Sequence, residues 1–108
     1  MKTFTCHFVF GSYKDCYFKL GQYENGNTAI EIITAEDGYS EPLCKATVNI
    51  GKQFEQIIPI KNYSENAGLL NCLINAGFIS RVISYEQQGF VKIPLCLMNW
   101  DKIKEYSL

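Results

Sequence analysis

The stretch QIIPIKNYSENAGLLNCLINAGFI, residues 56–79, decides the fold of this chain. It begins with a short apolar run that is typical of a strand and continues into a polar segment. Ser64 is a favoured N-cap residue type, and Glu65 in the first turn complements the positive end of the helix dipole. Gly77 supplies the left-handed residue that ends many helices. The pattern therefore predicts a strand followed by an α-helix over residues 65–76.

The predicted helix is amphipathic and too short to be stable alone in water, so it must pack on a sheet. Its polar face carries Asn71 and Asn75. Gly68 in a helix interior costs up to about 1 kcal/mol relative to alanine, and it would permit close approach to a strand or to a partner. The residues expected to face the core are Leu69, Leu70, Leu73 and Ile74.

Upstream of this unit, apolar and polar residues alternate in four runs, which predicts four strands. Glycine-containing turn signals separate them, and Asn25-Gly26 predicts a type I′ hairpin turn. Pro42 is expected at the start of the fourth strand, where a missing amide donor is tolerated. The predicted strands are residues 3–10, 16–20, 28–34 and 43–50, and the other turns are Gly11-Ser12 and Glu36-Asp37-Gly38.

Downstream of the helix, residues 81–85 and 90–97 predict a hairpin, in which Pro94 indicates an edge strand. The tail from Asn99 to Tyr106 predicts a final helical turn, with Ile103 and Trp100 packing back. The expected fold class is α+β, an antiparallel sheet of about six strands (a meander plus a C-terminal hairpin) packed against one central helix. A chain of 108 residues fits a single domain, 1–108.

Composition excludes some classes of function. The net charge of −1 argues against a long face that grips nucleic acid backbone. The charged content of 19% is low, which favours self-association as a homodimer or a surface for a partner. Residues 1–10 lack the pattern of a signal peptide, and no run is long enough to span a bilayer. We therefore expect a location in the cytoplasm of the host cell.

Five cysteines, at positions 6, 16, 44, 72 and 96, contain no Cys-x-x-Cys pair, and His7 is the only histidine. This set does not predict a zinc site, so no metal or cofactor is expected. Buried, reduced thiols are the expected state. Cys6 and His7 are neighbours on a strand and point to opposite faces, whereas Cys16 would approach His7 only in a suitable register. A Cys–His nucleophile remains an alternative.

The middle of the chain is acidic. Between Leu20 and Cys44 there are five acids and no Lys or Arg. They predict either a solvated sheet edge with acidic turns or an acidic patch that meets a basic surface on a partner. The five acids are Glu24, Glu31, Glu36, Asp37 and Glu41.

Three segments, AEDGYSEPLCKATVNI (35–50), IKNYSENAGLLNCLINAGFI (60–79) and GFVKIPLCLM (89–98), together resemble a small bacterial family called domain of unknown function 4313. The resemblance runs from the third predicted strand onward, about two-thirds of the chain, and is most specific at residues 62–66 and at Ala76-Gly77. The amino-terminal third departs from the family in detail. The resemblance implies a gene carried by phages and conjugative elements of gut bacteria, and it brings no catalytic residues.

The first functional hypothesis is a non-enzymatic counter-defence protein that binds and inhibits a host defence nuclease complex, as anti-CRISPR proteins do. Small size, the lack of a catalytic set and an acidic segment able to compete with nucleic acid for a basic groove support it. Tyrosines would anchor the complex and acids would steer its formation. The expected contacts are Tyr23, Glu24, Glu36, Asp37, Tyr39 and Glu41.

Two other hypotheses come from different classes. One is a protein that binds and sequesters a signalling nucleotide, for which Arg81, Tyr85 and Lys92 are the candidate cluster. The other is a Cys/His hydrolase. The polar run at residues 63–66 also has two interpretations, the start of a helix capped by Ser64 or a site for an anion or a partner. If Ser64 is the cap, Ser64→Ala should cost about 1 kcal/mol.

Overall fold

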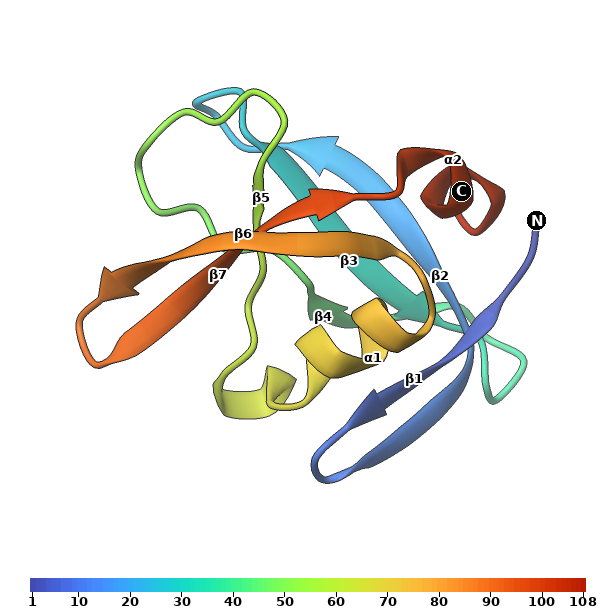
Figure 1. The fold of residues 1–108 in the computed structure, drawn as a ribbon. Helices are drawn as coiled ribbons and strands as arrows, with labels where there is room; N and C mark the ends of the chain where they lie inside the picture. The colour runs from blue at the N-terminus through green and yellow to red at the C-terminus, as the bar shows by residue number, and fades with distance from the viewer.

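The computed structural model describes residues 1–108 and contains seven strands in two antiparallel sheets (Figure 1). The first sheet, in the order β1-β2-β3-β4, consists of β1 (Phe4–Phe8), β2 (Gly11–Gln22), β3 (Thr28–Thr34) and β4 (Glu41–Lys45). The second, in the order β5-β7-β6, consists of β5 (Ile58–Pro59), β6 (Ile79–Gln88) and β7 (Val91–Met98). The predicted α+β class is confirmed, with two sheets instead of one.

One 3₁₀ turn and two short α-helices complete the fold: η1 (Ser64–Asn66), α1 (Leu69–Asn75) and α2 (Trp100–Glu105). Helix α1 contacts β1 of the first sheet and β6 of the second. The core is a single cluster of 17 buried residues, to which both sheets and both α-helices contribute. The two sheets therefore share one hydrophobic interior. No helix has the length and apolar character needed to cross a membrane.

The meander follows the predicted alternation, but its turns differ from the prediction. Gly11 belongs to β2, so the first turn lies at residues 9–10. The type I′ turn at Asn25-Gly26 is wrong, because only Gly26, at φ 89°, has a positive φ. The connection is longer: the Gly26 amide donates to the Tyr23 carbonyl, and the Tyr23 amide donates to the Asn27 carbonyl. The ladder between β2 and β3 then begins at Gln22 and Thr28.

The predicted fourth strand, 43–50, is shorter than expected, because the chain leaves the first sheet after Lys45. Thr47 is buried, and its hydroxyl accepts a hydrogen bond from the Ile30 amide at 3.1 Å. Beyond this point the Lys61 amide donates to the Ala46 carbonyl, and Thr47 forms an isolated bridge with Ile60. The segment therefore joins the first sheet to the strand that starts the second.

The start of α1 corrects the prediction of a helix over residues 65–76 capped by Ser64. Ser64 lies within η1 at φ 54°, and α1 begins at Leu69 with Gly68 as its N-cap at φ 96°. An amide in the first turn of α1 is capped from further upstream instead, because Asn62 Oδ1 accepts from the Leu70 amide at 2.9 Å. A Cβ atom on Gly68 would lie 2.9 Å from the Val9 nitrogen. The expected close approach of Gly68 to a strand is confirmed at the end of β1.

The end of α1 is as predicted. Gly77 has φ 82°, its amide donates to the Ile74 carbonyl, and the Phe78 amide donates to the Leu73 carbonyl. This pair of bonds is a Schellman motif, which satisfies carbonyls left free by the helix end. The predicted face is wrong at one residue, since Ile74 is 38% exposed while Cys72 is buried. Because the helix packs against β1 on the side of Cys72, Cys72 rather than Ile74 faces the core.

The second sheet contains the predicted C-terminal hairpin, with β6 and β7 joined through Gly89 and Phe90. Pro94 does not lie on an edge strand, because β7 is the central strand between β5 and β6. The Ile60 amide donates to the Pro94 carbonyl at 3.0 Å. Since β5 is only two residues long, the hydrogen bonds between β5 and β7 end beside Pro94. The amide that Pro94 lacks therefore removes little of the pairing between these strands.

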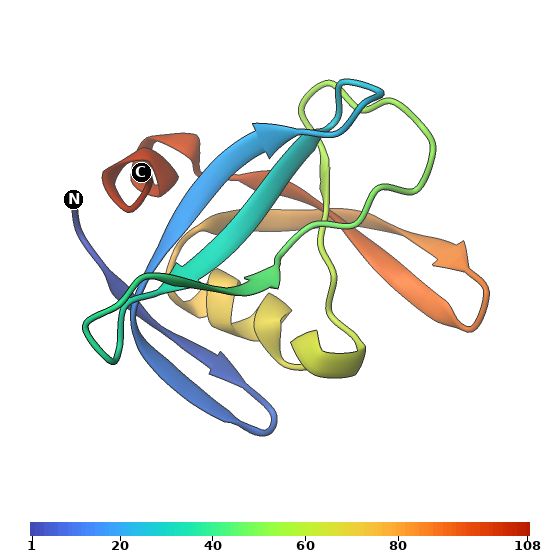
Figure 2. The ribbon, with the colours of Figure 1, turned by 180° about the vertical axis from the view of Figure 1, so that it is seen from behind.

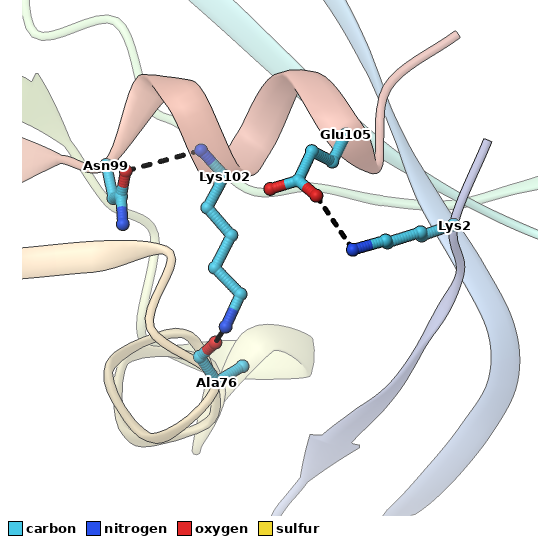
Figure 3. A network of polar contacts seen from close by, with 5 residues as sticks. All are labelled: Lys2, Ala76, Asn99, Lys102 and Glu105. Carbon is cyan, nitrogen blue, oxygen red and sulfur yellow. Dashed lines mark hydrogen bonds and ion pairs between the residues drawn. The ribbon is translucent and has the colours of Figure 1, made fainter.

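The predicted C-terminal helical turn is confirmed as α2. Asn99 caps it by accepting from the Lys102 amide at 3.3 Å, Ile103 is fully buried and Trp100 packs against the core. Lys102 also reaches back with its ammonium group to the Ala76 carbonyl at the end of α1 (Figure 3). The Lys2–Glu105 ion pair, 2.7 Å between Nζ and Oε1, holds the two termini side by side (Figures 1 and 3).

The corrected helix start gives a first prediction. Asn62→Ala should lower the free energy of unfolding by about 1 kcal/mol, because it removes the side-chain cap of the Leu70 amide. Ser64→Ala should change it by less than about 0.5 kcal/mol, since that side chain caps no helix amide. Chemical denaturation of both variants checks this. A larger loss in Ser64→Ala than in Asn62→Ala would restore Ser64 as the cap.

The contact of Gly68 with the end of β1 gives a second prediction. Gly68→Ala and Gly26→Ala both place a side chain at positive φ, but a Cβ on Gly26 meets nothing within 4 Å. Both should lose about 1–2 kcal/mol from backbone strain, and Gly68→Ala should lose about 1–3 kcal/mol more from overpacking. Thermal unfolding of the matched pair measures the difference. Equal losses would mean that the close approach contributes nothing.

Candidate functional site

The six residues predicted to contact a partner fall into two groups at opposite ends of β3. Tyr23 and Glu24 lie in the β2–β3 loop, and the other four lie at or beside the β3–β4 loop (Figures 1 and 2). The seven residues of β3 separate the groups by about 23 Å at ~3.3 Å per residue. One continuous patch therefore does not form. We call Glu36, Asp37, Tyr39 and Glu41 the acidic loop.

The acidic loop is held firmly at its base and is exposed at its tip. The Thr34 hydroxyl donates to the Lys14 carbonyl at 2.8 Å and accepts from the Glu36 amide at 3.3 Å. On the other side of the loop the Tyr17 hydroxyl donates to Ser40 Oγ at 3.0 Å. Tyr39, between these anchors, is 80% exposed. The loop thus presents an aromatic ring to solvent from a fixed base.

The carboxylates of the acidic loop have no partner within the chain. The three ion pairs in the structure are Lys2–Glu105, Lys52–Glu86 and Lys61–Glu65, and none involves Glu36, Asp37 or Glu41. All three of these acids are exposed. Their negative charge is therefore available to an external basic surface.

The acidic character does not continue along the sheet. Glu31 stands in the middle of β3, and its register neighbours are Lys19 on β2 and Lys45 on β4. Side chains directly opposite on one face of a sheet lie close enough to interact, so the two lysines offset the charge of Glu31. The negative surface of the acidic loop therefore does not extend along β3.

The other end of the sheet has a structural role. The Tyr23 hydroxyl lies 3.0 Å from Thr47 Oγ1, and the Lys45 ammonium lies 5.5 Å from the centre of the Tyr23 ring. The buried Asn27 side chain accepts from the Phe54 amide at 3.0 Å and also donates to the Lys52 carbonyl. These bonds tie the β2–β3 loop to the long connection before β5. Tyr23 is therefore half-buried and already engaged, while Glu24 beside it is exposed.

The three residues predicted to bind a nucleotide do not converge. Arg81 stands opposite Leu97 and Tyr85 opposite Pro94 in the register of β6 and β7. Residues 94 and 97 are an odd number apart on β7, so their side chains and those of their partners point to opposite faces. Lys92 shares the face of Pro94 and Tyr85. The bulge in β6 between Val82 and Ser84 produces this outcome, and a simple alternation along 81–85 does not reveal it.

The register that would bring Cys16 to His7, as the alternative of a Cys–His nucleophile requires, does not occur. Cys16 stands opposite Phe4 rather than His7, and its thiol donates to the Tyr13 carbonyl at 3.3 Å. The His7 imidazole points to the exposed side, where Nδ1 lies 2.7 Å from Ser12 Oγ. The thiol nearest to His7 belongs to Cys72 on α1, and it accepts a hydrogen bond from the His7 backbone amide at 3.3 Å. No imidazole contacts a thiol.

A groove with a volume of about 560 Å³ runs between β1 and α1. Its walls include His7, Phe8, Asn71 and Asn75, and Cys72 lies in it. Interaction with the neighbouring Cys6 thiol, followed by the hydrogen bond from the His7 amide, lowers the pKa of Cys72 to about 6 against the effect of burial. The contact with Cys72, together with burial, raises the pKa of Cys6.

The remaining thiols behave as ordinary buried cysteines. Burial raises the pKa of Cys44 and that of Cys96 to about 12, and it also raises the pKa of Cys16. No group of three or more His, Cys, Asp or Glu side chains is placed to hold a metal ion. The sequence does not predict the groove, because Cys72, which lines it, looks like one more apolar residue of the helix. Its contact with Cys6 joins segments far apart in the chain.

No protein-family model matches this chain, and neither a curated protein nor a solved structure matches it. The resemblance to domain of unknown function 4313 therefore stays a prediction.

Proposed function

We propose that the protein is a non-catalytic inhibitor of the counter-defence, anti-CRISPR-like kind. It would use the acidic loop to cover a basic surface on a host defence nuclease complex. The observation that carries the proposal is the exposure of Tyr39 between carboxylates that have no partner of their own. The mobile-element context comes only from the family resemblance.

Physical chemistry favours such a loop as a binding element. Tyrosine is enriched among the residues that contribute most to interfaces, because its ring buries a large area at a small cost in conformational entropy. The anchors at Thr34 and Ser40 hold the loop before binding, which lowers the entropy lost on association. Unpaired carboxylates around the ring steer the loop toward a basic groove.

The two alternatives have less support from the geometry. The candidate nucleotide-binding residues lie on two faces of the second sheet, so they do not form one pocket. The hydrolase hypothesis requires an imidazole that activates a thiol, and the His7 ring contacts Ser12 instead. We therefore retain partner binding as the proposed function.

The proposal is tested by phage plating on bacteria whose CRISPR–Cas nuclease targets that phage. Expression of the protein should restore plaques toward the number seen without a functional nuclease. The purified effector complex should bind the protein, and Glu36→Lys/Asp37→Lys should weaken this binding by about 100-fold or more, because like charges placed opposite each other cost several kcal/mol. Titration of wild type and variant at fixed salt gives the two affinities.

The matched control is Glu24→Lys/Glu55→Lys, which changes the net charge by the same amount at the opposite end of β3. Both of its residues are exposed, and Glu55 lies beside the β2–β3 loop. This variant should bind as wild type does. If both charge reversals weaken binding equally, the acidic loop is not the contact surface. If plaques are not restored against any nuclease type tested, the proposed function is wrong.

A further inference from the structure

The two thiols at the contact between β1 and α1 differ from the other three cysteines in arrangement. Cys6 is completely buried on β1, between Thr5 and His7, the two residues whose backbone groups contact the Cys72 thiol across the interface between strand and helix. The Cys72 thiol accepts a hydrogen bond from the His7 amide at 3.3 Å and donates to the Thr5 carbonyl at 3.9 Å. The Cys72 sulfur therefore lies against the backbone on both sides of Cys6.

The groove between β1 and α1 gives small molecules a path to this sulfur. Cys72 is 7% exposed and is one of the residues that line the groove, whereas Cys6 is not. The groove is large enough for a small reagent, at about 560 Å³. No carboxylate lines it. The titratable side chains near the two thiols are those of His7, Cys16 and Cys44 on the first sheet, and the Lys102 ammonium binds the carbonyl of Ala76 at the edge of the groove. Cys72 is therefore the thiol that a molecule in the groove can reach, and Cys6 lies behind it in the core.

We propose that Cys72 and Cys6 form a peroxide-reactive thiol pair, in which Cys72 attacks a hydroperoxide and Cys6 then closes a disulfide between α1 and β1. This site is independent of the proposed function, which rests on the acidic loop.

The chemistry balances in two steps. The Cys72 thiolate attacks one oxygen of the hydroperoxide ROOH, the O–O bond breaks, and Cys72 becomes a sulfenic acid while ROH leaves after taking up a proton. The Cys6 thiol then attacks the Cys72 sulfur, an S–S bond forms, and the sulfenic hydroxyl leaves with the Cys6 proton as water. Two thiols lose two electrons, and the hydroperoxide is reduced to ROH and water.

Electrostatics suit each thiol to its step. The hydrogen bond from the His7 amide stabilises negative charge on the Cys72 sulfur, and Cys72 is the one cysteine whose pKa is lowered, so it ionises before the other four thiols. Cys6 keeps its proton and stays unreactive toward the peroxide, because burial disfavours its charged form. Cys6 lies between the two β1 residues that contact the Cys72 thiol, so the second step needs only a local movement. The β1 strand is irregular between Phe4 and Cys6, where the register shifts.

The experiment treats the purified, reduced protein with hydrogen peroxide and maps its peptides by mass spectrometry. We expect a linkage between the peptides that contain Cys6 and Cys72, loss of two of the five thiols, and a higher Tm, because the crosslink closes a long loop. In Cys6→Ala the Cys72 sulfenic acid should persist and be trapped by dimedone. Cys44→Ala, the matched control, should form the disulfide as wild type does.

A second measurement needs no variant. Limiting iodoacetamide near pH 7 should label Cys72 before Cys44, although Cys44 is the more exposed of the two, and labelling of Cys72 should fall as the pH is lowered through about 6. The proposal is overturned if Cys44 reacts first. It is overturned equally if peroxide leaves Cys72 reduced or links it to a cysteine other than Cys6.

Discussion

The fold depends on the packing of one aromatic ring, that of Phe78. Its ring centre lies 4.8 Å from that of Phe4 on β1, 4.9 Å from that of Phe18 on β2 and 5.0 Å from that of Tyr106 after α2. Its backbone amide closes the end of α1 on the Leu73 carbonyl. Aromatic rings at such distances contribute beyond the area that they bury. Phe78 therefore joins the first sheet, the end of the helix and the C-terminal segment. The residue that follows it, Ile79, begins β6, so Phe78 also connects these parts to the second sheet.

This arrangement places the functional surfaces outside the shared core. The acidic loop projects from the end of the first sheet, and its Tyr39 ring takes no part in the interior. The thiol pair lies where α1 meets β1, so a disulfide between Cys6 and Cys72 would stabilise a contact on which both sheets depend. Oxidation could in this way alter the stability of the whole fold without a change at the acidic loop. The two proposed sites are separate in position and in chemistry.

Local signals in the sequence predicted much of this fold, and tertiary contacts decided the rest. Period-two alternation located the strands, and Gly77 located the helix end, because both depend on neighbouring residues alone. The start of the helix was not predictable in this way, since its cap comes from Asn62 outside the helix. The bulge in β6 between Val82 and Ser84 placed Arg81 and Tyr85 on opposite faces, and the chain crossing between sheets buried Thr47. The acidic loop was visible in the sequence, whereas the contact of Cys72 with Cys6 required the fold.

The most direct test of the central claim is native-state hydrogen exchange on Phe78→Leu and on wild type. The variant removes the ring but keeps an apolar side chain, so the protein should remain folded. If Phe78 joins both sheets in one core, the protection of the Phe18 amide on β2 and of the Cys96 amide on β7 should fall by the same free energy. A loss confined to one sheet, with the other unchanged, would show that the two sheets are stabilised independently and would contradict this account.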